Sequence, residues 1–243
     1  GRRVRKAFVA RAGYVLISLD YSQIELRVLA HISQDPGLLR AFAAGEDIHA
    51  RTAAEIFGVP LGGVTPDMRR KAKEINFGLN YGMSPYGLAR RLSISADEAA
   101  SYIQAYFTRY PRVQNYMSET LAYAHEHLYA KTLLGRRIPT PGVRDSHHQR
   151  QENARRAAIN APIQGSAADL MKKAMVDVHA ELRSEGDRAA ILLTVHDELV
   201  LEAAEDRAEE VCRRCRERME QALRLDVPTP VEISMGPSWA DLN

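Results

Sequence analysis

This sequence of 243 residues is poor in cysteine, in long apolar segments and in net charge. Cys212 and Cys215 are its two cysteines, too few for a disulfide scaffold, so a reduced, cytoplasmic setting is expected. There is no run of about eighteen apolar residues, so no helix is predicted to span a membrane. Lys and Arg (33) nearly balance Asp and Glu (31), giving a net charge of +2. Bulk charge therefore indicates no polyanion partner, and nucleic-acid binding would need locally gathered cations.

The composition that remains is that of an ordinary globular protein, with 45% hydrophobic and 26% charged residues. It allows one large domain or two small ones. No secretory signal precedes the first predicted strand. Because the sequence starts with Gly1 and not with Met, we expect it to be a piece of a longer protein.

Predicted strands lie near both ends of the chain, with a mainly helical stretch between them. Residues 14–19 form an apolar, β-branched run, and Ser22 with Glu25 forms a capping box that opens a helix to about residue 33. A hairpin is predicted near the other end, with His196 and Asp197 at its turn. The remaining expectations are helices from 36 to about 142, a long helical region broken at Pro162, a helix over 205–223 and a strand over 231–235. The pattern predicts an α+β fold.

Four side chains spaced four residues apart form a stripe on a well-capped predicted helix: Arg69, Lys73, Phe77 and Tyr81. Two cations come first, where the helix dipole is also positive, and two aromatic rings follow. A nucleoside triphosphate has the same order, with a charged tail and a stackable base. The alternative is a solvated basic turn followed by core aromatics, and the pattern alone does not decide between them.

Two aspartates, Asp20 and Asp197, each follow an apolar strand. A carboxylate at a strand end is held rigidly and still reaches solvent, so two that converge could hold two divalent cations. Oxygen ligands favour Mg²⁺. Taken singly, each residue also has an ordinary structural explanation, Asp20 beside a helix cap and Asp197 in a hairpin turn.

Five segments together resemble the family A DNA polymerases, the DNA polymerase I type. Their residues are DYSQIELRVLAHIS (20–33), RRKAKEINFGLNYG (69–82), VHDELV (195–200), RAAINAPIQGSAADL (156–170) and DIHARTAAEIFG (47–58). The first three are similar to motifs A, B and C of that family, in the family's order. The last two resemble its template-contacting helix region and part of its fingers. The resemblance covers essentially the whole chain.

The resemblance implies roles for matching residues. Asp20, Asp197 and the Tyr21 carbonyl are implied as ligands of two Mg²⁺ ions, with Glu198 as an accessory catalytic carboxylate and Lys73 as a proton donor to pyrophosphate. The residues implied to bind the dNTP are Tyr21, Gln23, Glu25, His49, Arg69, Lys73, Phe77 and Tyr81. Those implied to contact primer and template DNA are Arg156, Asn160, Gln164 and His196. Glu25 thus has two candidate roles, as a capping residue and in closing the sugar pocket.

The implied fold is an antiparallel-sheet palm with a largely helical fingers insertion and with the thumb absent. The expected boundaries are palm over 1–32 and 151–243 and fingers over 33–150, with the missing thumb and N-terminal polymerase part supplied by the parent chain. The expected partners are primer–template DNA and dNTPs, with no membrane. The expected reaction is templated nucleotidyl transfer with release of pyrophosphate.

Two other functions use similar residues. A truncated remnant would bind nucleic acid or dNTP without efficient catalysis, and a two-metal nuclease would leave the stripe from Arg69 to Tyr81 without a purpose. The Cys212-x-x-Cys215 pair has no second pair and is interpreted as two incidental cysteines, not as a zinc or redox site.

Overall fold

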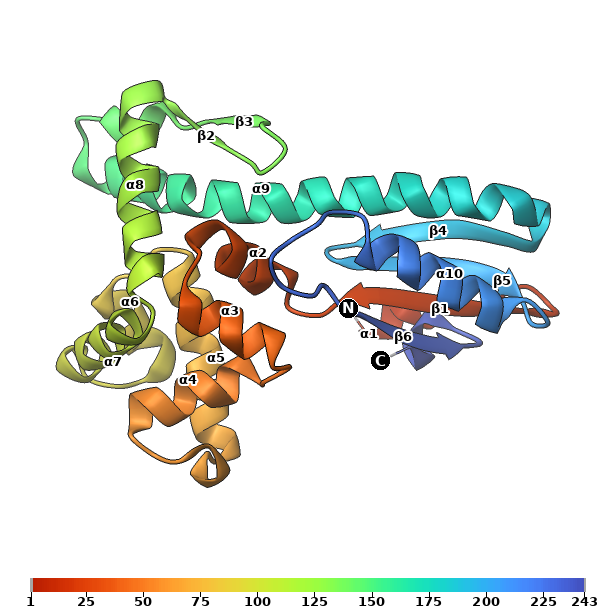
Figure 1. Ribbon diagram of the computed structural model, residues 1–243, viewed down its shortest axis with the longest axis horizontal. Coiled ribbons are helices and arrows are strands. Elements are labelled where there is room, and N and C mark those ends of the chain that lie inside the picture. Colours follow the sequence, from red (N-terminus) through yellow and green to blue (C-terminus); the bar gives the residue numbers. More distant parts are fainter. Residues whose placement is uncertain (1, 243) are drawn as a thin grey trace. The chain divides into compact units, whose positions relative to one another are not determined.

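The structure, a computed structural model, describes the backbone of residues 2–242 and the side chains of residues 4–242. Helices and antiparallel strands are mixed in it, which confirms the predicted α+β class (Figure 1). The chain divides into two compact units. We call Gly1–Ile24 with Ala167–Asn243 the sheet unit, and Glu25–Ser166 the helical unit. These limits differ from those expected for palm and fingers, whose assignment stays a prediction.

The sheet unit is built on four antiparallel strands in the order β4–β5–β1–β6. The central strand β1 pairs on one side with β5 and on the other with β6. Residues Leu16, Ile17 and Leu19 of β1 are at most 1% exposed, as expected for a strand covered on both faces. The strands are β1 (Tyr14–Tyr21), β4 (Ala189–Val195), β5 (Glu198–Ala204) and β6 (Val231–Gly236).

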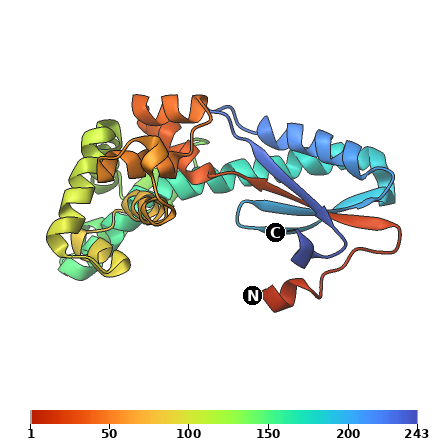
Figure 2. The same ribbon diagram turned by 90° about the horizontal axis from the view of Figure 1, so that it is seen from below.

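Each face of this sheet is covered by other parts of the same unit (Figure 2). On one face Tyr21 donates a hydrogen bond from its hydroxyl to the Met219 carbonyl of α10, at 2.5 Å. On the other face Leu16 packs with Leu242 and Trp239. The helical segments of the unit are α1 (Arg2–Arg5), the second part of α9 (His148–Leu182), η3 (Arg183–Arg188), α10 (Ala208–Glu220) and η4 (Trp239–Asp241).

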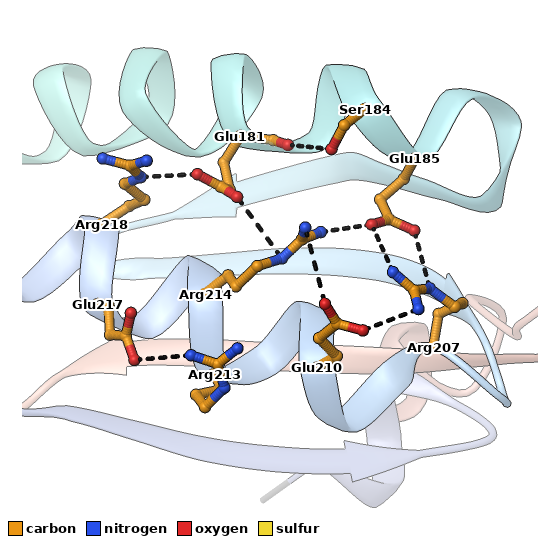
Figure 3. A network of polar contacts seen from close by, with 9 residues as sticks. All are labelled: Glu181, Ser184, Glu185, Arg207, Glu210, Arg213, Arg214, Glu217 and Arg218. Atoms are coloured by element: carbon orange, nitrogen blue, oxygen red, sulfur yellow. Dashed lines mark hydrogen bonds and ion pairs between the residues drawn. The ribbon is translucent and has the colours of Figure 1, made fainter.

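A network of ion pairs joins α10 to the end of α9 and to η3 (Figure 3). The side chain of Glu185 is 5% exposed and binds both Arg207, at 3.1 Å, and Arg214. Glu181 binds Arg214 at 3.5 Å and Arg218 at 2.7 Å. Hydrogen bonds from Arg207, above all, lower the pKa of the Glu185 carboxyl. Since buried carboxylates with several partners resist separation, the network fixes α10 along α9.

Most of the shorter helices of the helical unit begin at a residue whose side chain accepts a backbone hydrogen bond. Five of them have a capping side chain: Asp35, Asp47, Thr65, Ser84 and Ser95. Proline in the first turn, as at Pro66, adds to this start signal. The elements are α2 (Ile24–Ser33), α3 (Pro36–Ala43), α4 (Ile48–Phe57), η1 (Leu61–Gly63), α5 (Pro66–Asn80), α6 (Pro85–Leu92), α7 (Ala96–Arg109), α8 (Pro111–His127), β2 (Tyr129–Lys131), β3 (Arg137–Pro139), η2 (Pro141–Arg144) and the first part of α9.

The predicted break at Pro162 is wrong, because α9 continues through it from His148 to Leu182. Proline removes the N–H that would reach the carbonyl of residue 158. The Tyr116 hydroxyl donates to the neighbouring carbonyl of Ile159 at 2.8 Å, and Ala158 and Ile163 are both fully buried. Packing and this extra donor therefore hold the helix together where the local sequence predicts its end.

The hairpin of β2 and β3 was missed by the sequence prediction, which placed helix there. It lies against α9, where a Cβ on Gly165 would come within 2.6 Å of Thr132 Cγ2. Leu133 N donates to Ser166 Oγ at 2.9 Å, and Arg136 Nη2 donates to the Gly165 carbonyl at 2.9 Å. Glycine is required at this position because the hairpin approaches the helix backbone so closely.

Asp35 links the starts of two helices. Its Oδ1 accepts hydrogen bonds from Gly37 N (2.8 Å) and Leu38 N (3.2 Å) in the first turn of α3. Its Oδ2 accepts from Arg112 N (3.1 Å) in the first turn of α8. Asp35 itself is 0% exposed, so its carboxylate depends on these donors and not on water for its hydrogen bonds.

We predict that Asp35→Ala lowers the free energy of unfolding by about 3 kcal/mol, since three N–H groups lose a charged acceptor in the interior. Ser95→Ala is the matched control, because Ser95 caps α7 through one exposed bond to Glu98 N; we expect a loss of about 1 kcal/mol there. Urea denaturation followed by circular dichroism measures both. Equal losses in the two variants would show that Asp35 is an ordinary single cap.

Candidate functional site

The sheet unit brings together the two aspartates that the sequence singles out. Asp20 is the penultimate residue of β1 and lies opposite Glu198, the first residue of β5. Asp197 occupies the two-residue turn between β4 and β5, and its carbonyl accepts a hydrogen bond from Tyr21 N at 3.1 Å. The predicted hairpin with His196 and Asp197 at its turn is thereby confirmed. His196 has a φ of 55°, a left-handed conformation that lets the chain reverse within two residues.

Asp20 lies in a partly buried, acidic environment. Burial, together with the carboxylates of Asp197, Glu198 and Glu232, raises the pKa of Asp20 to about 6. Glu232 was not predicted as a site residue, yet it lies opposite Asp20 in the β1–β6 register. The Oδ1 atom of Asp20 is buried and has no hydrogen-bond partner in the described part of the chain. Such a group carries unused affinity for a proton or a cation.

Glu198 is held in place by two donors that sequence reasoning also missed. Its Oε1 accepts hydrogen bonds from Ser18 Oγ at 2.7 Å and from Trp239 Nε1 at 3.3 Å. Glu198 is 7% exposed. The strand alternation could have indicated Ser18, two residues before Asp20 and on the same face of β1, whereas Trp239 carried no recognisable signal.

The donor set suits a hard divalent cation. Carboxylate oxygens are the ligands that Mg²⁺ prefers, and the free oxygen of Asp20 together with the neighbouring carboxylate of Asp197 offers them. The Tyr21 side chain points into the core, so only the backbone of this residue is available to a cation. Among the residues described, no three Asp, Glu, His or Cys side chains already form a metal cluster. Mg²⁺ usually keeps several waters and needs only one or two carboxylates.

The predicted stripe in the helical unit lies along α5, which starts at the Thr65 cap as expected. Arg69 and Lys73 are exposed, and Phe77 is half-buried. Arg69 Nε binds Asp47 Oδ2 at 2.6 Å, while Lys73 Nζ lies 6.0 Å from the centre of the Phe77 ring. Both interpretations of the stripe place the cations on the surface, so their exposure does not separate the two, whereas Phe77 is half-buried and not a fully buried core aromatic.

His49 lies on α4 beside this stripe, with its ring centre 5.9 Å from that of Phe77. The residue is 3% exposed. Burial, assisted by Arg69 and Lys73 and opposed by Asp47, lowers the pKa of His49 to about 4. The imidazole is consequently uncharged at neutral pH, so His49 does not add to the positive charge of the stripe.

Tyr81, the residue after α5, connects the stripe to two other predicted site residues. Its hydroxyl donates to Glu25 Oε2 at 2.5 Å and accepts from Gln164 Nε2 at 3.4 Å. Burial and the bond to Glu25 raise the pKa of Tyr81 to about 12. The Glu25 carboxylate thus has a partner other than a helix N-terminus. The N–H of Ser22, which a capping box would pair with Glu25, donates to the Pro230 carbonyl at 3.1 Å, so the predicted reciprocal bond is replaced by another.

The remaining residues predicted to contact DNA follow one face of α9. Arg156, Asn160 and Gln164 recur at intervals of four residues. The guanidinium of Arg156 donates to Asn153, and Asn160 Oδ1 is buried without a hydrogen-bond partner among the described residues. Gln23 follows β1 in a left-handed conformation, with a φ of 54°.

The two cysteines are both free and buried. Burial raises the pKa of Cys212 to about 11 and that of Cys215 to about 12. Both remain protonated at neutral pH, so neither offers the thiolate that metal binding or redox chemistry requires. This supports their interpretation as incidental core residues.

The chain is similar over nearly its whole length to known polymerases. The sequence model of DNA polymerase family A matches residues 1–241. A DNA polymerase I of Pseudomonas aeruginosa is 52% identical over 239 residues, which are 98% of this chain and 26% of the relative. The thermostable DNA polymerase I of Thermus thermophilus is 50% identical over 98% of this chain and 28% of its own length.

Among solved structures, the POL domain of Pol1 from M. smegmatis, in complex with DNA primer–template and dNTP, is similar with a TM-score of 0.95. It is 46% identical in sequence, and the match covers 99% of this chain and 43% of that one. The present chain thus spans about a quarter of the length of these curated relatives. Within residues 2–242, no helix is long and apolar enough to cross a membrane.

We predict that Asp20→Asn stabilises the metal-free protein at pH 7 by about 2 kcal/mol, because the folded state holds the Asp20 proton more tightly than the unfolded chain does. The sign follows from the raised pKa. Between pH 4 and pH 6, roughly, the unfolded state loses the proton first, so the free energy of unfolding of the wild type falls as pH rises. In Asp20→Asn this contribution is absent, so its free energy of unfolding should not show this decrease.

Urea denaturation with EDTA and with Mg²⁺ measures the effect. Mg²⁺ should stabilise the wild type and have a smaller effect on Asp20→Asn. Asp187→Asn is the control, at an exposed aspartate of the same unit, and should match the wild type. A variant that is less stable than the wild type at pH 7 in EDTA would contradict the account of Asp20.

Proposed function

This chain belongs to DNA polymerase family A, and from that membership we propose that it is the catalytic core of a template-directed DNA polymerase. The proposed reaction is attack of a primer 3′-hydroxyl on the α-phosphate of a dNTP, with release of pyrophosphate. The main observation in support of the proposal is that the carboxylates of Asp20, Asp197 and Glu198 lie close together at one end of the sheet. The relative from M. smegmatis, solved with primer–template and dNTP, supports the choice of substrates.

Asp20, Asp197 and the Tyr21 carbonyl would hold two Mg²⁺ ions, with Glu198 as the accessory carboxylate. Bound there, the ions would supply charge stabilisation to the attacking and leaving oxygens. The chain's own contribution is to fix these ligands. The Tyr21–Asp197 backbone bond sets the spacing of the two aspartates, while Ser18 and Trp239 orient Glu198. Desolvation of Asp20 favours neutralisation by a cation.

On the helical unit, Arg69 and Lys73 would bind the triphosphate as exposed cations near the positive end of α5. Lys73 would also give a proton to the departing pyrophosphate. His49 would contribute a phosphate contact, and Phe77 would pack on the sugar and base. Because the Phe77 ring is half-buried, one part of it is fixed by the protein and the other is free to contact a ligand.

Glu25 and Tyr81 would close the pocket around the sugar, with Gln23 as a further contact to the dNTP. The 2.5 Å bond from the Tyr81 hydroxyl to Glu25 supports this role, since it holds a carboxylate in a defined position. Arg156, Asn160 and Gln164 would contact template and primer from α9, and His196 would do so from the hairpin turn.

The domain assignment belongs to the same proposal. We assign the sheet unit to the palm and the helical unit to the fingers, and we expect the parent protein to supply the missing N-terminal part and the thumb. The setting is proposed to be cytoplasmic, which the two protonated, unpaired thiols support.

We predict that Asp20→Asn and Asp197→Asn each reduce the rate of primer extension more than about 100-fold, because losing charge stabilisation of this kind costs several kcal/mol. The affinity for primer–template should stay within a few-fold, since neither residue is a proposed DNA contact. Asp187→Asn serves as the control and should extend primers at the wild-type rate. The assay uses this chain with Mg²⁺, a labelled primer and four dNTPs. Extension by either variant above about a hundredth of the wild-type rate would refute the metal assignment.

For Glu25, we predict that Glu25→Ala increases ribonucleotide incorporation relative to dNTP by about tenfold or more, as expected when a steric and electrostatic block is removed. Tyr81→Phe should give a smaller increase, because the carboxylate remains but loses its hydroxyl partner. Glu74→Ala is the control, since Glu74 lies on α5 and is paired with Arg91. Single-nucleotide insertion with paired rNTP and dNTP measures the ratio. An unchanged ratio in Glu25→Ala, accompanied by a loss of stability, would leave Glu25 with a structural role alone.

A further inference from the structure

The buried amide of Asn76 forms the contact from which this inference starts. Asn76 lies on α5 and His49 on the neighbouring helix α4, and the two residues are 1% and 3% exposed. Asn76 Nδ2 is 3.0 Å from His49 Nδ1. Asparagine is a poorer helix former than alanine, so a buried asparagine in the middle of a helix calls for a specific interaction.

This contact determines which ring nitrogen of His49 carries the proton. An amide nitrogen only donates, so it requires an acceptor at Nδ1, and a neutral imidazole with an unprotonated Nδ1 carries its proton on Nε2. In an imidazolium, the N–H at Nδ1 would face the N–H of the amide. With the amide nitrogen of Asn76 facing the ring, as in this structure, the two residues fit together in one protonation state only.

Two of the charged groups around the ring also favour the neutral form, and a third, Asp47, opposes them. Arg69 and Lys73, from α5, disfavour a second positive charge on His49. Asp47, at the start of α4, is the acidic group that acts on the ring among the described residues. Its carboxylate is shared among Arg69, His49 N and Ala50 N, which weakens it as the counter-charge of an imidazolium.

We propose that Asn76 is a positioning residue that fixes His49 as the neutral tautomer with its proton on Nε2. The ring then offers the triphosphate a hydrogen-bond donor that does not change with pH, beside the two permanent cations Arg69 and Lys73. The use of this donor rests on the proposed function, whereas the tautomer does not depend on it.

The tautomer is read directly by ¹⁵N NMR of the histidine side chains in the nucleotide-free protein, with His49→Gln used to assign the His49 signals among the eight histidines. We expect Nδ1 to appear as an unprotonated acceptor and Nε2 as protonated, with no titration between pH 6 and pH 8, a range about the ordinary pKa of histidine. A protonated Nδ1, or titration within this range, in the wild-type protein would overturn the proposal.

Asn76→Asp tests the cause. A carboxylate in place of the amide accepts a proton from Nδ1, so the signal of His49 should change to the Nδ1-protonated or doubly protonated form and its pKa should rise. The matched control is Asn80→Asp, which alters another buried asparagine one turn along α5 and should leave the His49 tautomer unchanged. Retention of the wild-type tautomer in Asn76→Asp would show that Asn76 does not set it.

Steady-state kinetics test whether the N–H donor of His49 contributes to dNTP binding, a question separate from which tautomer is present. His49→Gln keeps a neutral N–H donor and should hold the KM for dNTP within about threefold of the wild type, whereas His49→Leu should raise it about tenfold, as expected for one lost hydrogen bond to a charged group. In Asn76→Asp, KM should become dependent on pH between 6 and 8, which the wild type should not show. Equal KM values for His49→Gln and His49→Leu would overturn the donor role. Failure of the wild type to extend primers would refute the proposed function while the NMR result stands.

Discussion

The antiparallel pairing of β1 with β5 determines where the acidic groups of this protein lie. The β5 strand follows Asp197 directly, and the bond from Tyr21 N to the Asp197 carbonyl closes the register at the end of the sheet. A slip of one residue would move Asp20 to the opposite face of β1, where Tyr21 now packs against α10. The hairpin turn, with the left-handed conformation of His196, prevents such a slip by limiting the loop to two residues.

This pairing has an electrostatic cost. Asp20, Glu198 and Glu232 lie side by side on three neighbouring strands, and like charges opposite each other destabilise a sheet. The same unit contains the ion-pair network of Glu181 and Glu185 with three arginines, in which every carboxylate has cationic partners. The two sets of carboxylates therefore differ in their role. Paired carboxylates stabilise α10, whereas the unpaired oxygen of Asp20 is available to a ligand.

Local signals in the sequence were sufficient to predict much of the fold. The cap at Thr65, the apolar run before Asp20 and the turn at His196 and Asp197 each depend on neighbouring residues, and each was predicted correctly. The course of α9 through Pro162 and the hairpin of β2 and β3 depend on distant partners. Tyr116 supports the first, and Gly165 accommodates the second. A pattern read along the chain does not contain such contacts.

The residues of the candidate site likewise differ in whether the sequence alone could indicate them. Asp20 and Asp197 could be singled out because a carboxylate after an apolar strand is conspicuous. Glu232 could not, because it becomes a neighbour of Asp20 only when β6 pairs with β1. Trp239 was missed for a similar reason, since its role is to donate to Glu198 and the sequence does not show that it will lie there. Ser18 differs, because the alternation of β1 places it on the same face as Asp20 and could have indicated it.

The near-zero net charge of the chain does not exclude local groups of like charge. Acidic groups gather at the end of the sheet within the sheet unit, and the exposed cations Arg69 and Lys73 lie on α5 within the helical unit. His49 fits this division, because burial and its contact with Asn76 keep it neutral beside those cations. For chemistry between polyanions, the local sign of the field matters more than the total. The composition could exclude a uniformly basic protein, whereas the proposed metal and phosphate sites rest on the placement of Asp20, Arg69 and Lys73.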